Sequence, residues 1–204
     1  TAWFLRHRLR EGMVRELRSP LSGLIEADEA FVGGPAKEKR GRGVASSPNK
    51  SLIIGAVEIV THETKNGMIN EKAGRLRLQK IPAANEEEIK FFLNNNVALG
   101  STIKSDGWTG YSNDALIGYK HLRLIQESPQ QASELAPHIH RVFSNLKTWL
   151  GGIHHGVEPK YLQSYLNEFV FRFNRREHPM SAFRSLLSIV VSKNPLTLEQ
   201  LTKP

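Results

Sequence analysis

The spacing of hydrophobic positions changes twice along the chain and divides it into three parts. At the N-terminus they recur at helical spacing and predict a helix over residues 2–17, which Ser19-Pro20 ends. The middle part has alternating or continuous apolar runs bounded by turn residues, as strands do. From Pro137 onward helical spacing returns. It predicts three helices: 138–150, a second from Pro159 to Phe173, and 181–192.

The middle part predicts a mixed sheet. Strands are expected over residues 21–32, 51–60, 75–81, 101–105 and 122–125, with a helix over 86–99. Three strands joined by turns should be antiparallel neighbours. A strand reached through the 86–99 helix should run parallel to its partner, through a right-handed crossover. The sequence therefore indicates an α/β or α+β domain with a five-stranded mixed sheet, flanking helices and a helical C-terminal part.

Composition excludes several classes of protein. Hydrophobic residues make up 39% of the chain and charged residues 24%, as in ordinary globular domains with a core. No run approaches the roughly 18 apolar residues that cross a bilayer, and the N-terminus does not resemble a secretory signal. The chain has no cysteine, which excludes disulfides and thiolate metal sites. These features predict a cytoplasmic protein with no membrane partner.

The charge balance favours a polyanionic partner. Lysine and arginine total 28 against 20 acidic residues, for a net charge of +8. Charge alone fits a merely basic protein equally well, but the cations cluster on two separate segments, which suits duplex DNA. The clusters are Lys37, Lys39, Arg40 and Arg42 in a Gly-rich loop, and Arg172, Arg175 and Arg176 at the end of an apolar helix.

Two aspartates are candidates for metal binding. Asp28 lies inside the first predicted strand among apolar residues, where a carboxylate is costly unless paired or bound to metal. The alternative is an edge strand with its acidic face in water. Asp106 ends a short predicted strand, where functional carboxylates gather in open α/β sheets, although an ordinary Asp-Gly turn fits equally. Carboxylates on adjacent strands repel unless a divalent cation bridges them, and such ions catalyse phosphoryl transfer.

Three segments resemble the signature blocks of a bacterial insertion-sequence transposase family related to the eukaryotic Merlin transposons: IEADEAFVGG, SDGWTGY and HIHRVFSNLKTWLGGIHHGVEPKYLQSYLNEFVFRFNRR. The resemblance runs from Leu24 to Arg176 with the blocks in the family's order. It implies an integrase-like, DDE-type catalytic domain with an RNase H-like fold, which the predicted sheet fits. It also implies Mg²⁺ or Mn²⁺ as cofactor, transposon ends and target DNA as double-stranded partners, and a homodimer or higher oligomer in a nucleoid-associated DNA complex.

The same resemblance assigns the site residues. Asp28 and Asp106 correspond to the first two catalytic aspartates. His140 stands 34 residues after Asp106, where many relatives carry glutamate, and Lys147 follows seven residues later on the same helix face. An imidazole nitrogen can ligate metal, although it suits manganese or zinc better than magnesium. Asn145 is the alternative third member, and His140 is favoured.

Other positions carry roles by the same resemblance. Lys147 is expected to contact DNA near the scissile phosphate, with an ordinary solvated helix lysine as the alternative. Trp108 is expected to wall the active site or contact DNA, with a core position as the alternative. Arg172, Arg175 and Arg176 are expected phosphate contacts, with a solvated helix end as the alternative.

Relatives usually carry an N-terminal zinc ribbon and helix-turn-helix, which a chain without cysteine lacks in part. We therefore expect residues 1–20 to be the tail of a DNA-binding region, 21–180 the catalytic domain, and 181–204 a C-terminal helix and tail. The predicted activity is metal-dependent DNA strand cleavage and strand transfer. The alternatives are an inactive or truncated remnant that only binds DNA, and a metal-dependent nuclease of the same fold.

Overall fold

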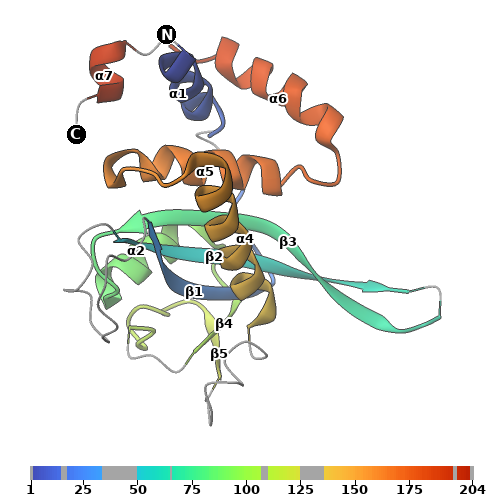
Figure 1. Cartoon of the computed structure of the whole chain (residues 1–204). Coiled ribbons are helices and arrows are strands. Elements are labelled where there is room, and N and C mark those ends of the chain that lie inside the picture. Colours follow the sequence, from blue (N-terminus) through green and yellow to red (C-terminus); the bar gives the residue numbers. More distant parts are fainter. Residues whose placement is uncertain are drawn as a thin grey trace. The chain divides into compact units, whose positions relative to one another are not determined.

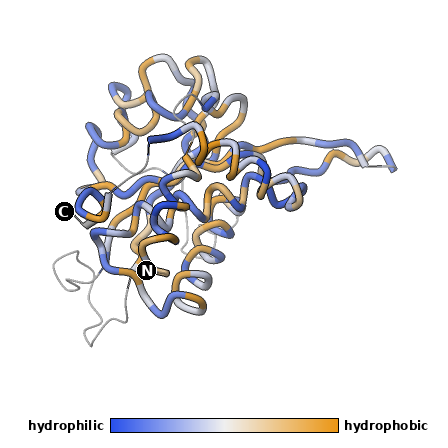
Figure 2. Tube along the Cα trace, turned by 90° about the horizontal axis from the view of Figure 1, so that it is seen from above, coloured by the Kyte–Doolittle hydropathy of each residue, from blue (hydrophilic) through white to orange (hydrophobic). Residues whose placement is uncertain are grey.

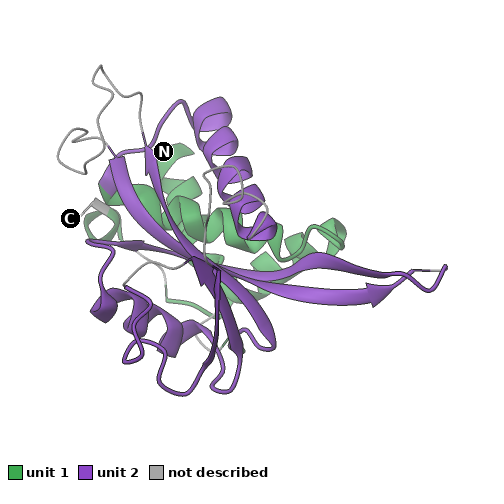
Figure 3. Cartoon of the chain, turned by 90° about the horizontal axis from the view of Figure 1, so that it is seen from below, with its two compact units in different colours: residues 1–19, 160–204 green, residues 20–159 purple. Residues whose placement is uncertain are grey.

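The computed structural model describes residues 2–14, 18–33, 50–64, 66–106, 110–124, 136–194 and 197–202. They fall into two compact units (Figure 3). Unit 1 combines Thr1–Ser19 with Lys160–Pro204, and unit 2 is Pro20–Pro159.

A five-stranded mixed sheet forms the centre of unit 2 (Figure 1). Its strands are β1 (Leu24–Gly33), β2 (Lys50–Glu63), β3 (Ile69–Ile81), β4 (Thr102–Asp106) and β5 (Lys120–Leu124). Their order is β3-β2-β1-β4-β5; the β1–β2 and β2–β3 pairs are antiparallel, and the β1–β4 and β4–β5 pairs are parallel. The predicted mixed sheet, with its change from antiparallel to parallel pairing, is confirmed.

The β2–β3 hairpin is longer than predicted. Its ladder continues to the pair formed by Glu63 and Ile69, beyond the residues that alternate in hydrophobicity. Gly67 adopts a positive φ of 76° in the connecting turn, a conformation that glycine reaches without steric cost. Backbone hydrogen bonds extend the strands through polar residues, and such bonds leave no hydrophobic pattern to read.

Helix α2 (Glu86–Asn96) covers one face of the sheet. The Asn85 side chain caps it by accepting from the Glu88 N–H, and the helix buries its apolar face against β1 and β4. Each such buried side chain contributes about 1.5–3 kcal/mol. The helix stops earlier than the predicted Leu99, because Val97 leaves helical geometry and bridges to Leu21. Fully buried residues of this core include Ile25, Ala27, Ile89, Phe92, Leu93 and Ile103.

Helix α4 (Pro137–His154) packs on the opposite face, against β1 and β2. The faces are opposite because Ile54 and Ala56 belong to the α2 core, whereas a side chain at Gly55, between them, would meet Ile139 and Phe143 of α4. Residues at alternate positions of β1, Glu26 and Asp28 among them, therefore face α4. This helix is the element that closes the candidate site.

Unit 1 is helical. It contains α1 (Ala2–Gly12), α5 (Leu162–Phe173), α6 (Pro179–Val191) and α7 (Leu198–Thr202), and the short turn η2 (Pro159–Tyr161) precedes α5. Helix α1 ends at Gly12 rather than at the predicted residue 17; residues 15–17 lie outside the described part of the chain. Helix α7 was not predicted.

An ion pair ties α1 to α5. The Arg10 Nε donates to Glu168 Oε2 at 2.8 Å, and the Arg10 guanidinium lies 3.8 Å from the Tyr165 ring centroid.

Hydrophobic and hydrophilic residues interleave along the helices (Figure 2). None of the helices in the described ranges is both long enough and apolar enough to cross a membrane.

Candidate active site

The two predicted carboxylates come from neighbouring strands. Glu26 of β1 pairs in register with Lys104 of β4, in parallel orientation. Asp28 follows Glu26 by two residues on β1, and Asp106, the last residue of β4, follows Lys104 by two, just beyond the paired part of the two strands. Because side chains alternate, Asp28 shares the α4 face with Glu26, and Asp106 shares the face of Lys104.

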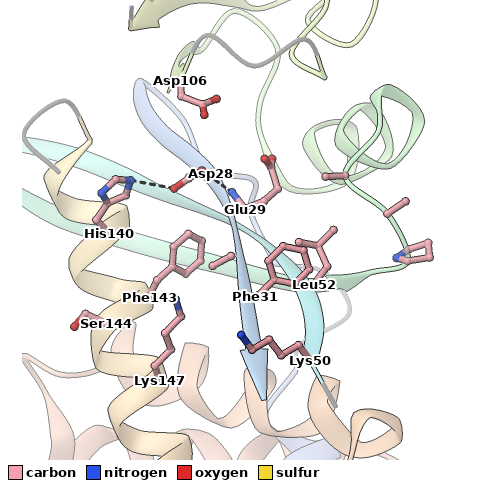
Figure 4. A pocket seen from close by; sticks show the side chains of 14 residues that line it. Asp28, Glu29, Phe31, Lys50, Leu52, Asp106, His140, Phe143, Ser144 and Lys147 are labelled. Atoms are coloured by element: carbon pink, nitrogen blue, oxygen red, sulfur yellow. Dashed lines mark hydrogen bonds and ion pairs between the residues drawn. The ribbon is translucent and has the colours of Figure 1, made fainter. Parts of the chain in front are cut away.

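A pocket of about 1150 Å³ contains both aspartates (Figure 4). Its walls come from β1, the start of β2, the residues that follow β3, the end of β4, and α4. The lining residues are Asp28, Glu29, Ala30, Phe31, Lys50, Leu52, Pro82, Ala83, Ala84, Asp106, His140, Phe143, Ser144 and Lys147. The structure thus brings Asp28, Asp106, His140 and Lys147 together.

His140 contacts Asp28 directly. Its Nε2 lies 3.0 Å from Asp28 Oδ2, and the two side chains are 33% and 21% exposed. The hydrogen bond with Asp28 raises the pKa of His140 above its usual value against the opposing effect of burial, and the charges of Asp28, Glu26 and Asp106 act in the same direction as the bond. In this arrangement the ring nitrogen that faces the carboxylates is a donor to Asp28.

Glu29 is a third carboxyl group in the pocket, and sequence reasoning gave it no role. The Tyr111 hydroxyl donates to Glu29 Oε1 at 2.7 Å. Burial, together with the charges of Asp28 and Asp106, raises the pKa of Glu29 to about 7 in spite of that hydrogen bond. Burial and the same acidic neighbours also raise the pKa of Tyr111. The pocket is therefore a site in which negative charge is crowded.

Glu29 lies beyond the last paired residues of β1 and β4. The β1–β4 pairing covers only Leu24 to Glu26 of β1, so the β1 edge after Glu26 is not paired with β4. Residues of both faces, Asp28 and Ala30 on one side and Glu29 and Phe31 on the other, then line one pocket. The hydrophobic pattern does not contain this information, since it depends on where the pairing of β1 with β4 stops.

Two lysines line the pocket away from the aspartates (Figure 4). Lys147 lies on α4 two turns after His140, as the spacing predicted. Lys50 is the first residue of β2, one residue before the start of the predicted strand. The distribution of charge in the pocket, with acids beside Asp28 and lysines beyond Phe143, suits a phosphodiester that spans it.

The remaining predicted residues lie elsewhere. Asn145 is exposed and is not among the described residues that line the pocket. Lys37, Lys39, Arg40, Arg42 and Trp108 lie outside the described residues, so their predicted DNA contacts stay predictions.

The predicted cluster of arginines at positions 172, 175 and 176 belongs to unit 1 and makes local contacts there. Arg172 Nη1 pairs with Glu168 Oε1 at 3.2 Å. Arg175 and Arg176 lie over the rings of Phe171 and Phe173, 3.8 and 4.1 Å from the centroids, and donate to the carbonyls of the same residues. Both therefore cap the end of α5, and their role toward phosphate stays a prediction.

The donor set fits a divalent cation in part. Across the described ranges, no group of three or more histidine, aspartate or glutamate side chains is close enough to hold a metal ion. Asp28 and Asp106 nevertheless offer the hard oxygen donors that Mg²⁺ and Mn²⁺ accept. Burial is the main cause of the raised pKa of Glu29, and the charges of Asp28 and Asp106 raise it further; a bound cation would relieve that repulsion.

Comparison with known proteins identifies the family. A family model described as the ISXO2-like transposase domain matches residues 20–174. A search of curated proteins found no match. The match includes every residue of the pocket, and the chain therefore belongs to the ISXO2-like transposase family. A relationship to the Merlin transposons stays a prediction.

Proposed function

We propose that this member of the ISXO2-like transposase family cleaves DNA strands and transfers them to target DNA in a metal-dependent reaction. One observation carries the proposal: Asp28 and Asp106, from neighbouring parallel strands, line one pocket with His140 and Lys147. The reaction exchanges phosphodiester bonds without a covalent protein intermediate. A water oxygen attacks phosphorus and a 3′-oxygen leaves. That 3′-hydroxyl then attacks a phosphorus of target DNA, whose own 3′-oxygen leaves.

Asp28 and Asp106 are the residues that would hold Mg²⁺ or Mn²⁺, and His140 would join them as a third ligand only once its Nε2 no longer donates to Asp28. When bound, the cation supplies positive charge at the oxygens that attack and leave in an in-line displacement. The chain's own residues do the rest. His140 orients the Asp28 carboxylate through their 3.0 Å contact. Lys147 and Lys50 neutralise phosphates beside the scissile one, which positions the strand across the pocket.

Two alternatives predict different products. An inactive remnant that only binds DNA is favoured by the histidine at the position where many relatives carry glutamate. A nuclease of the same fold would cut without joining. Assembly as a homodimer or higher oligomer on DNA, and association with the nucleoid, belong to the transposase proposal and not to the nuclease.

Supercoiled plasmid with Mn²⁺ tests the proposal. We expect the wild-type protein to nick the plasmid, Asp28→Asn to abolish nicking, and Asp114→Asn, a change at an exposed aspartate of the same unit, to leave it unaltered. Binding without nicking would support the remnant. Pre-cut ends that carry the repeats flanking the reading frame should be joined to target plasmid; nicking without joined products would support the nuclease.

A further inference from the structure

Helix α4 begins without a cap of its own. Its N-cap residue is Ala136, which makes no side-chain capping hydrogen bond, and Pro137 occupies the first turn. The first N–H groups of any α-helix lack partners within the helix and need acceptors from elsewhere when they are buried. In α4 these are the N–H groups of His138 and Ile139, since Pro137 has none.

Glu26 of β1 supplies these acceptors from across the structure. Its side chain is 0% exposed. Its Oε2 accepts from the His138 N–H at 2.9 Å and from the Ile139 N–H at 3.0 Å. Its Oε1 accepts from Lys104 Nζ at 3.2 Å. A buried carboxylate is tolerated only when it is paired and hydrogen-bonded, and here both oxygens are engaged.

These contacts join the two halves of the candidate site. Glu26 lies two residues before Asp28 on the same face of β1, and Ile139 immediately precedes His140 in α4. One carboxylate therefore connects the strand that carries Asp28 to the helical turn that carries His140. The negative charge also lies at the helix N-terminus, where the helix dipole stabilises it.

We propose that Glu26 is a positioning residue, which fixes the start of α4 on β1 and thereby holds His140 against Asp28, with Lys104 orienting the Glu26 carboxylate. The catalytic consequence rests on the proposed function. The position of α4 on β1 does not depend on that function, so the two consequences are tested separately.

Glu58 provides a matched control. It is a second buried glutamate of the same sheet, 7% exposed, and it also accepts from backbone N–H groups and a cation. Its partners are the N–H of Ser22, the N–H of Arg75 and the Arg75 guanidinium, none of which belongs to α4. A variant at Glu58 therefore loses a comparable set of hydrogen bonds and an ion pair, but no contact that holds α4.

Position is measured first, without DNA or metal. The chain has no cysteine, so Asn95→Cys on α2 and Thr148→Cys on α4, both exposed, accept a pair of spin labels for distance measurement by pulsed EPR. We expect Glu26→Ala to broaden or shift the distance distribution. The double variant Glu26→Gln/Lys104→Met keeps an amide oxygen as acceptor and removes both charges, and should restore the wild-type distribution. Glu58→Ala should leave it unchanged. A wild-type distribution in Glu26→Ala would overturn the proposal.

Amide exchange gives a test that needs no variant to fold. In the wild-type protein the N–H groups of His138 and Ile139 should exchange far more slowly than unstructured amides, because Glu26 accepts from both. Exchange of both at the unstructured rate would contradict the proposal, whatever the stability of the Glu26 variants.

Catalysis is measured last. With Mn²⁺ and saturating DNA, Glu26→Ala should slow nicking about 100-fold, the typical effect of misplacing a catalytic group by about 1 Å, with an unchanged half-saturating DNA concentration. The double variant should recover most of the rate, and Glu58→Ala should retain it. A Glu26→Ala loss that the double variant does not recover would refute positioning through hydrogen-bond acceptance. If wild type does not nick, the proposed function fails, whereas the EPR and exchange results still decide the role of Glu26.

Discussion

Gly55 allows α4 to approach the sheet beside Asp28, and a side chain there should destabilise the protein. Gly55 pairs in register with Asp28 on the adjacent strand. A Cβ at position 55 would lie 2.9 Å from Leu78 Cδ2, 2.9 Å from Phe143 Cε1 and 3.0 Å from Ile139 Cδ1. The substitution that tests this close approach is Gly55→Ala.

The magnitude follows from these contacts. Carbon atoms pack favourably at about 3.5–4.0 Å, so each of the three neighbours must retreat by about 0.5–1 Å. Leu78, Ile139 and Phe143 are buried side chains, and only Phe143 borders the pocket, so the other two must move within the core. Overpacking of this kind costs about 1–3 kcal/mol. Alanine also stabilises the protein by about 0.4–1 kcal/mol, because it restricts the unfolded chain more than glycine does. The net decrease in the free energy of unfolding is therefore about 1–2 kcal/mol.

Urea denaturation followed by circular dichroism measures this loss, and Gly151→Ala is the control. Gly151 lies within α4 with no atom within 4 Å of an added Cβ, so alanine there should stabilise by about 0.5–1 kcal/mol. Opposite signs at the two glycines are the expected result. A Gly55→Ala variant as stable as wild type would refute the close approach of α4 to β2, and with it the placement of His140.

Three further predictions concern the pocket. In urea denaturation, Glu29→Gln should raise the free energy of unfolding by about 3 kcal/mol at pH 8 and by little at pH 5. The pKa of Glu29 is about 7 in the folded protein against 4.5 unfolded, so the wild-type protein loses stability as pH rises through that interval and the variant does not. Equal effects at both pH values would contradict this prediction. His140 should titrate above 6.5 by NMR, and Asp28→Asn should lower that pKa; the pair's contribution to stability is complete below pH 6.5 and is lost as pH rises through the folded pKa. Lys147→Ala should reduce the salt dependence of DNA binding by about one phosphate contact, whereas Lys90→Ala on α2 should not; equal slopes for both variants would remove Lys147 from the DNA interface.

Much of the fold was predictable because local rules decide it. Three strands joined by turns had to pair as antiparallel neighbours, and the helix before Thr102 required a parallel crossover. Element ends were less predictable. Gly12 ends α1, and Val97 leaves α2 to bridge with Leu21, although apolar residues continue beyond both points. Pairing of polar residues, as in the outer part of the β2–β3 hairpin, leaves no hydrophobic signal.

The candidate site was predictable mainly through the family resemblance, which assigned Asp28, Asp106, His140 and Lys147. The sequence pattern added that both aspartates belong to strands and that His140 and Lys147 share one helix face. The roles of Glu29 and Lys50 depend on where the β1–β4 pairing stops and where β2 begins, which no local pattern records.

The contact between Glu26 and the start of α4 has a signal in the sequence. Glu26 precedes Asp28 by two residues, and Lys104 precedes Asp106 by two. If the aspartates lie side by side on parallel strands, the glutamate and the lysine must also do so. The matched spacing therefore predicts the Glu26–Lys104 pair.

The most direct test of the central claim is anomalous diffraction from crystals of the protein soaked in Mn²⁺. The account predicts an anomalous peak within about 2.5 Å of carboxylate oxygens of both Asp28 and Asp106, and its loss in Asp28→Asn. Manganese bound to one aspartate alone, or only at sites remote from both, would contradict a shared cation site between β1 and β4.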